Sequence, residues 1–274
     1  MTIKAILALA DGGAGTEATL RTALLVAKGF SAHLDVLHVR ADPETMVPIV
    51  GEGMSGAMVE QVMDAMVKSI ETRASAARAA FQRVCEPAGD AVTWRAATGR
   101  EPEVTAAAGR LADLIVLGRP DSAEEAPMAA TIDAALFDTG RPVLVAPPIA
   151  VSTVGNRVVI AWNGTAQAAR AVAVALPFLL KAQQVIIAVG GGEDGPAPAT
   201  GLVAYLERHG VRATIEGFVI SHGIGKSLLE HVGRLGADLL VMGAYGHSRL
   251  REMILGGATR EVLAGASVPV LMGH

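Results

Sequence analysis

The sequence predicts an α/β protein made of two similar halves, each a doubly wound parallel sheet covered by helices on both faces. Short apolar runs of strand length alternate with segments of helical periodicity along the whole chain of 274 residues. These runs are continuous rather than alternating, as expected of strands that are buried on both faces. The order of strands, turns and helices in the first half is then repeated in the second.

In the first half, the apolar runs predict strands at residues 3–10, 33–39, 91–97, 113–117 and 142–146. The turn Asp11-Gly12-Gly13 ends the first of them, and Thr16 begins a helix whose predicted end is Gly29. Residues 42–56 are predicted as a loop, and helices at 57–83, 101–111 and 128–137. The longest helix carries an apolar stripe, which indicates packing in a core or between subunits rather than a ligand surface.

A short connector that begins at Pro147-Pro148 and ends near Gly155 separates the two halves, so domains are predicted at 1–148 and 155–274. The pattern of the first half then restarts with a strand at 157–162 and a helix capped by Thr165. The remaining expected elements are strands at 184–189, 212–219, 238–242 and 268–272 and helices at 199–209, 226–235 and 258–263.

Direct sequence matches relate the two halves. The run from Gly109 to Gly118 corresponds to Gly233–Gly243 with one inserted residue, and Ala10-Asp11-Gly12 corresponds to Trp162-Asn163-Gly164. Ligands of doubly wound folds bind beyond the carboxyl ends of the strands, where the strand order reverses. The Asn163 turn and the loop 243–259 are therefore predicted to flank one crevice.

Composition limits the class of protein. Apolar residues make up 51% of the chain and charged residues 18%, so the chain can form a large core and is not expected to be disordered. The net charge of −4, with no long basic run, argues against a nucleic-acid partner. Cys85 is the single cysteine, and no apolar run reaches the length of a membrane span. A cytoplasmic protein without a membrane partner is therefore expected.

The last part of the chain is rich in glycine. Gly243 and Gly246 follow the predicted strand 238–242, and Gly256 and Gly257 precede a helix. Glycines at a strand end let the backbone approach a ligand closely. The free N–H groups and the dipole at the start of a helix favour an anion such as a phosphate.

This stretch resembles the nucleotide-binding signature of the universal stress protein family: Gly, two residues, Gly, nine residues, Gly, then Ser or Thr. Gly243, Gly246 and Gly256 match it in register, and Gly257 stands at the hydroxyl position. The resemblance covers nearly the whole chain and implies the tandem form of the family, with its adenine-nucleotide hydrolase-like fold. It further implies that the ligand is ATP or AMP and that Mg²⁺ binds only together with ATP. The residues implied to bind the nucleotide are Trp162, Asn163, Val189, Met242, Gly243, Gly246, His247, Gly256, Gly257, Ala258 and Thr259.

The first half differs at the corresponding place. No second glycine follows Gly118 at the family spacing, and Glu124 and Glu125 would repel a phosphate, so a degenerate nucleotide site is predicted there. This half keeps Asp11, which corresponds to the acidic residue near the adenosine in nucleotide-binding members. The second half has Asn163 at this position, an amide that can both accept and donate hydrogen bonds.

Other motifs in the sequence give weaker evidence for a function. Gly223 to Ser227 has the residue order of a P-loop, but Ile220 stands where its first glycine belongs. An ordinary helix start is the preferred interpretation, although Lys226 could reach an anion held by the neighbouring loop. The seven histidines show no metal-ligand spacing, and no G-x-S-x-G motif supports a hydrolase. Cys85 is predicted to be a packing residue.

Three functions stay open at this point. The first is a nucleotide-binding module or sensor in a stress response, and the second is a nucleotide-free, dimerising scaffold that acts through protein partners. The third is an enzyme, for which no general base is evident, so at most slow ATP hydrolysis is expected. The resemblance also implies pairing through the last strand, which makes Val143–Val145 and Val270–Met272 the predicted seam, either between the halves of one chain or in a homodimer. The helix at 57–83 is predicted to cover this seam or to form a larger assembly.

Overall fold

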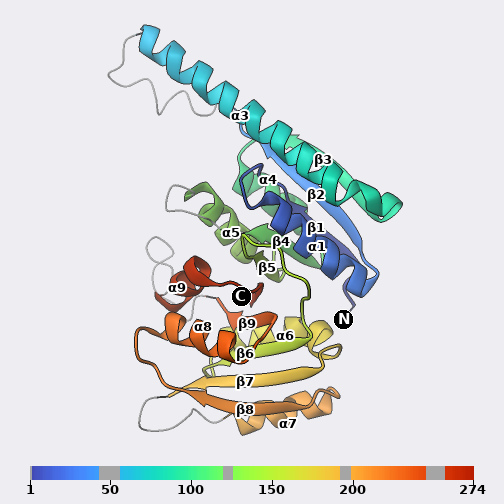
Figure 1. The fold of residues 1–274 in the computed structure, drawn as a ribbon, viewed down its shortest axis with the longest axis vertical. Coiled ribbons are helices and arrows are strands. Elements are labelled where there is room, and N and C mark those ends of the chain that lie inside the picture. The colour runs from blue at the N-terminus through green and yellow to red at the C-terminus, as the bar shows by residue number, and fades with distance from the viewer. Residues whose placement is uncertain (1, 43–55, 120–125, 192–198, 245–256) are drawn as a thin grey trace.

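A computed structural model describes residues 2–42, 56–119, 126–191, 199–244 and 257–274. Figure 1 shows an elongated molecule in which the first half of the chain lies above the second. Strands and helices alternate in both halves, as the hydrophobic pattern predicts, and the α/β fold class is confirmed.

The first half contains five strands that alternate with helices. Its elements are β1 (Ala5–Leu9), α1 (Thr16–Phe30), β2 (His33–Arg40), α3 (Gly56–Val84), the short 3₁₀ helix η2 (Glu86–Ala91), β3 (Val92–Thr98), α4 (Glu101–Gly109), β4 (Leu114–Gly118), α5 (Ala126–Asp138) and β5 (Val143–Ala146). The second half repeats this order with β6 (Arg157–Trp162), α6 (Ala166–Leu179), β7 (Gln184–Gly190), α7 (Thr200–Arg208), β8 (Ala213–Phe218), α8 (Ile224–Arg234), β9 (Leu239–Gly243), α9 (Gly257–Gly265) and β10 (Val270–Gly273).

All ten strands form one sheet in the order β3-β2-β1-β4-β5-β10-β9-β6-β7-β8. Within each half the neighbours are parallel, and the first and fourth strands lie side by side, β1 with β4 and β6 with β9. The strand order therefore reverses at the same place in both halves, as in other doubly wound sheets.

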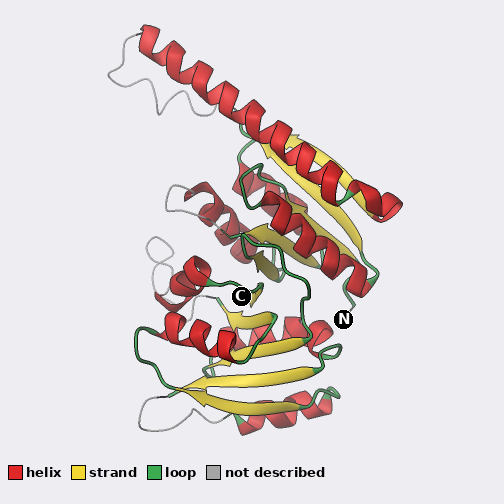
Figure 2. Cartoon of the chain, viewed as in Figure 1, coloured by secondary structure: helices red, strands yellow, loops and turns green. Residues whose placement is uncertain are grey.

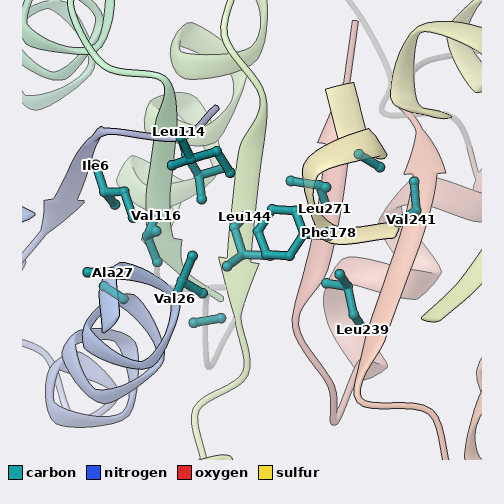
Figure 3. Close-up of a cluster of buried hydrophobic side chains, with 14 of the residues drawn as sticks. Ile6, Val26, Ala27, Leu114, Val116, Leu144, Phe178, Leu239, Val241 and Leu271 are labelled. Atoms are coloured by element: carbon teal, nitrogen blue, oxygen red, sulfur yellow. The ribbon is translucent and has the colours of Figure 1, made fainter. Parts of the chain in front are cut away.

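The two halves meet where β5 pairs with β10, and this pairing is antiparallel. Val145 lies opposite Val270, and Leu144 lies opposite Leu271. Both leucines are fully buried, and Figure 3 shows them beside Phe178 of α6, in the middle of a cluster that spans the two halves. The predicted seam is thus confirmed as a pairing within one chain.

Helices cover both faces of the sheet (Figure 2). Apolar side chains of α1, α3, α6 and α7 pack on one face, and those of α4, α5, α8 and α9 pack on the other. Since alternate residues of the inner strands belong to opposite clusters, most of their residues are buried, which explains the continuous apolar runs in the sequence. The edge strands β3 and β8 are mostly exposed or half-buried.

One aspartate in each half fixes the start of the central strand. The Asp113 carboxylate accepts hydrogen bonds from the backbone N–H groups of Lys4 (2.8 Å) and Ala5 (3.0 Å). Asp238 accepts three, from Gly155, Asn156 and Arg157, at 2.8–3.1 Å. Both aspartates therefore act as structural caps.

Two expectations are wrong. The helix predicted to end at Gly29 continues to Phe30, and Ser31 takes the left-handed conformation instead, with φ of 49°. The extra residue places the Phe30 ring 4.8 Å from that of Phe178, in the interface between the halves. The long helix α3 does not cover the seam: it packs on α1 and β2, where Ala77 and Phe81 are buried (Figure 1).

Candidate functional site

The predicted crevice lies at the carboxyl ends of β6, β7 and β9. Trp162 and Val189 are register partners at the ends of β6 and β7, and Met242 is near the end of β9. The Val189 side chain is fully buried, so only its backbone could face a ligand. The topology therefore brings these three predicted residues to one edge of the sheet.

The turn after β6 is held by hydrogen bonds within it. Asn163 Oδ1 accepts from the Thr165 backbone N–H (3.2 Å) and from the Thr165 hydroxyl (2.8 Å). Gly164 takes a positive φ of 74°, as Gly12 does in the first half with 80°. Thr165 caps α6 by accepting from Ala168 N, which confirms the predicted cap. The Asn163 side chain itself is exposed.

Gly243 has a packing role that the motif does not reveal. A Cβ atom at this position would lie 2.6 Å from Ala168 N and from the carbonyl carbon of Gln167. The equivalent Gly118 is similarly close to α1, with 2.8 Å between such a Cβ and Thr19 Oγ1. Both glycines let a helix start cross the end of the fourth strand at close range.

The helix α9 begins at the same edge of the sheet, because it follows β9 and runs back toward β10. Gly257 is exposed, and among the described residues no atom outside its immediate neighbours lies within 4 Å of a Cβ built there. Ala258 is half-buried, and Thr259 is only 4% exposed, so its side chain faces the interior. The predicted site residues Gly246, His247 and Gly256 lie outside the described residues.

Glu261 of α9 occupies the start of α8. Its Oε2 atom accepts from the backbone N–H groups of Gly225 (2.8 Å) and Lys226 (3.3 Å). A Cβ at Gly225 would lie 2.5 Å from Glu261 Cβ, so this glycine permits the close contact of the two helices. The resemblance of this segment to a P-loop is thus explained by packing, and the carboxylate takes the position that an anion would need.

Removing this carboxylate is expected to loosen α9. Glu261→Ala leaves two N–H groups at the start of α8 without a protein acceptor and removes a negative charge from the positive end of the helix. We expect the free energy of unfolding to fall by about 1–2 kcal/mol, measured by urea denaturation. Glu230→Ala, at an exposed position on α8, is the control and should change it by less than about 0.5 kcal/mol. Equal effects of the two substitutions would contradict this role.

The other end of α9 is in contact with the first half. Arg119, which follows β4, donates from Nη1 to the carbonyl oxygen of Ala264 at 2.5 Å. A cation at a helix C-terminus is favourable because the carbonyl groups there carry partial negative charge. The helix that bears the predicted phosphate glycines is therefore fixed by α8 on one side and by the first half at its end.

The corresponding crevice of the first half is occupied by protein groups. The helix α3 lies against the turn after β1, since a Cβ at Gly12 would be 2.1 Å from the carbonyl oxygen of Arg73. Asp11 accepts from the Thr16 hydroxyl at 2.6 Å, and Glu101 accepts from the Thr131 hydroxyl at 2.9 Å. Burial raises the pKa of Glu101, although the hydrogen bond from Thr131 opposes this shift. Glu124 and Glu125 fall outside the described ranges.

The remaining candidates have structural roles. Cys85 is buried, and burial raises its pKa to about 11, which fits the predicted packing role. Within the described residues, no group of three or more histidine, cysteine or acidic side chains could hold a metal ion. No helix in that part of the chain is both long and apolar enough to cross a membrane.

The fold and the crevice define a doubly wound α/β protein with two related halves, and comparisons with known proteins agree. Residues 202–274 match the model of the Universal stress protein family. A universal stress protein from Synechocystis is 29% identical over 171 residues. This match covers 58% of the chain and 57% of the relative, so the chain spans little more than half of that protein's length.

Solved structures extend the similarity to both halves. A universal stress protein from Archaeoglobus fulgidus has a TM-score of 0.69 at 17% identity, over 98% of this chain and 97% of that one. A functionally unknown protein from Pseudomonas aeruginosa has a TM-score of 0.57 at 15% identity, over 99% and 92%. The C-terminal part of the chain thus matches the Universal stress protein family model, and the whole chain shares its fold with a solved universal stress protein.

Proposed function

We propose that residues 155–274 form a domain that binds an adenine nucleotide, ATP or AMP, and that the protein acts as a nucleotide-binding module or sensor in a stress response. The observation that carries the proposal is the start of α9, where Gly257 is exposed and has no atom of the described residues within 4 Å of a Cβ built on it. Free N–H groups and the positive end of the helix dipole favour phosphate there. Family membership of this half supports the same site.

Residues 1–148 form a second domain in this proposal, one that does not bind a nucleotide. The contact of α3 with the Gly12 turn and the buried carboxyl group of Glu101 support this difference between the halves. The first domain instead pairs its β5 with β10 and holds α9 through Arg119. A cytoplasmic location and slow ATP hydrolysis at most, with Mg²⁺ bound only together with ATP, belong to the same proposal.

Calorimetric titration of ATP and AMP into the purified protein tests the proposal. We expect saturable binding to the wild type and about three- to tenfold tighter binding of ATP to Gly257→Ser, because a hydroxyl there can donate to a phosphate. The position accepts a side chain without a clash. Gly257→Ala is the matched control, since it adds the Cβ without the hydroxyl. Absence of binding heat for both nucleotides in wild type and Gly257→Ser would refute the proposal.

The alternative, a nucleotide-free scaffold acting through protein partners or as a homodimer, would need a surface other than the seam. The edges of β5 and β10 are already paired with each other inside the chain. The helix α3 extends well beyond its contacts with α1 and β2 (Figure 1), and Met58 near its start is 55% exposed. This extension is the surface that favours the alternative, and the molecular mass in solution, measured by light scattering, would show whether it pairs two chains.

A further inference from the structure

A buried hydrogen-bond donor at the end of β6 has no partner among the described residues. The indole Nε1 of Trp162 is shielded from solvent, and no acceptor of that part of the chain lies within hydrogen-bond distance of it. Burying an unpaired N–H group lowers folding stability, so such groups are rare in folded proteins and call for an explanation. Trp162 ends β6 beside Val189, at the edge where the nucleotide is expected.

The neighbouring Asn163 also presents donors and no free acceptor. A backbone N–H can only donate, so the Asn163 atom that faces Thr165 N must be the amide oxygen. This oxygen also accepts from the Thr165 hydroxyl, so both of its lone pairs are used inside the turn. The Nδ2 group, with two N–H donors, is the part of the exposed side chain that is left for a ligand.

The first half has the opposite polarity at the same positions. Asp11, the counterpart of Asn163, is a carboxylate, which only accepts when ionised. His38 of β2 lies beside Ala10, the counterpart of Trp162, and Nδ1 of its ring is 2.6 Å from the Ala10 carbonyl oxygen. Since a carbonyl only accepts, Nδ1 donates to it, and Nε2 has no partner among the described residues. The donors at Trp162 and Asn163 are thus specific to the second half.

We propose that Trp162 and Asn163 form a donor wall that determines which ligands the second half accepts. The inference rests on the proposed function, because the ligand is the nucleotide of the same crevice. The bound nucleotide presents acceptor atoms, such as ring nitrogens or ribose oxygens, to Trp162 Nε1 and Asn163 Nδ2. A site with aspartate at this position would select ligand hydroxyl or amino groups instead.

Two substitutions test the donor wall with ATP as the probe, by calorimetry. Trp162→Phe keeps an aromatic ring but removes the donor, and we expect about tenfold weaker binding. Asn163→Asp replaces donors by an acceptor and is also expected to weaken binding by about tenfold. Repeating the titration in about 1 M salt, where the Debye length is about 3 Å, separates this effect from repulsion between the new carboxylate and the phosphates.

Fluorescence gives a readout that a purely structural role would not change. The chain has two tryptophans, so Trp94→Phe leaves Trp162 as the single indole fluorophore. We expect ATP to change the emission of Trp162 in this variant. In Trp162→Phe the remaining Trp94, which packs on Phe81 in the first half, should not respond. Without nucleotide, Trp162→Phe should unfold at the same temperature as the wild type or a higher one, because it removes an unpaired buried donor.

The possible results distinguish a failure of this inference from a failure of the proposed function. If the wild type binds no nucleotide, the proposed function fails and the donor wall fails with it. If the wild type binds ATP but Trp162→Phe binds it equally well, or Asn163→Asp binds it more tightly in high salt, only the donor wall is overturned. Asn163 is exposed, so Asn163→Asp remains a valid test even if Trp162→Phe does not fold.

Discussion

Replacing Gly243 by alanine is expected to lower the free energy of unfolding by about 3 kcal/mol, because the new methyl group meets the backbone of α6. The methyl carbon would lie 2.6 Å from Ala168 N, and neither this atom nor its helix can rotate away as a side chain would. The start of α6 is also fixed by the Thr165 cap. Thermal unfolding should show a midpoint lower by roughly 6–12 °C.

Gly257→Ala is the matched control, since it places a methyl group at the start of α9, where no atom of the described residues is within 4 Å. We expect it to change the free energy of unfolding by less than about 0.5 kcal/mol. Similar stabilities of the two variants would show that the backbone of α6 yields easily and would contradict the packing role of Gly243. If the prediction holds, loss of nucleotide binding in Gly243→Ala alone cannot be taken as loss of a ligand contact.

The fold can be predicted from the sequence because buried strands give a recognisable hydrophobic pattern in the sequence. Continuous apolar runs mark strands that are covered on both faces, and the repeated Ala10-Asp11-Gly12 and Trp162-Asn163-Gly164 turns align the two halves. The seam is expected from the resemblance to a family whose members pair through the last strand, and the structure pairs Leu144 with Leu271 there.

The contacts that shape the site could not be predicted in this way, because they join residues far apart in sequence. Glu261 caps a helix that begins more than 30 positions earlier, at Gly225, and no local signal pairs them. The motif marks Gly243 for a ligand, but only the position of α6 reveals the second reason for a glycine. The unpaired N–H of Trp162 is likewise a property of its surroundings in the folded chain.

Gly12→Ala is expected to have a still larger effect, because it combines two costs. At φ of 80° an alanine is disfavoured by about 1–2 kcal/mol, since its Cβ crowds the following carbonyl group. The Cβ would also lie 2.1 Å from the carbonyl oxygen of Arg73, so α3 would have to move away from the turn. We expect a loss of about 4 kcal/mol in the free energy of unfolding.

A substitution in the equivalent turn of the second half distinguishes the cost of the positive φ from the cost of the steric contact. Gly164 has nearly the same φ, 74°, but no atom lies within 4 Å of a Cβ built there. Gly164→Ala should therefore lose only about 1–2 kcal/mol, and the difference between the two variants measures the contact with α3. Hydrogen exchange should increase along α3 in Gly12→Ala and stay unchanged there in Gly164→Ala. Equal losses of stability, with α3 equally protected in both, would mean that α3 does not rest on this turn and that the first crevice is open to a ligand.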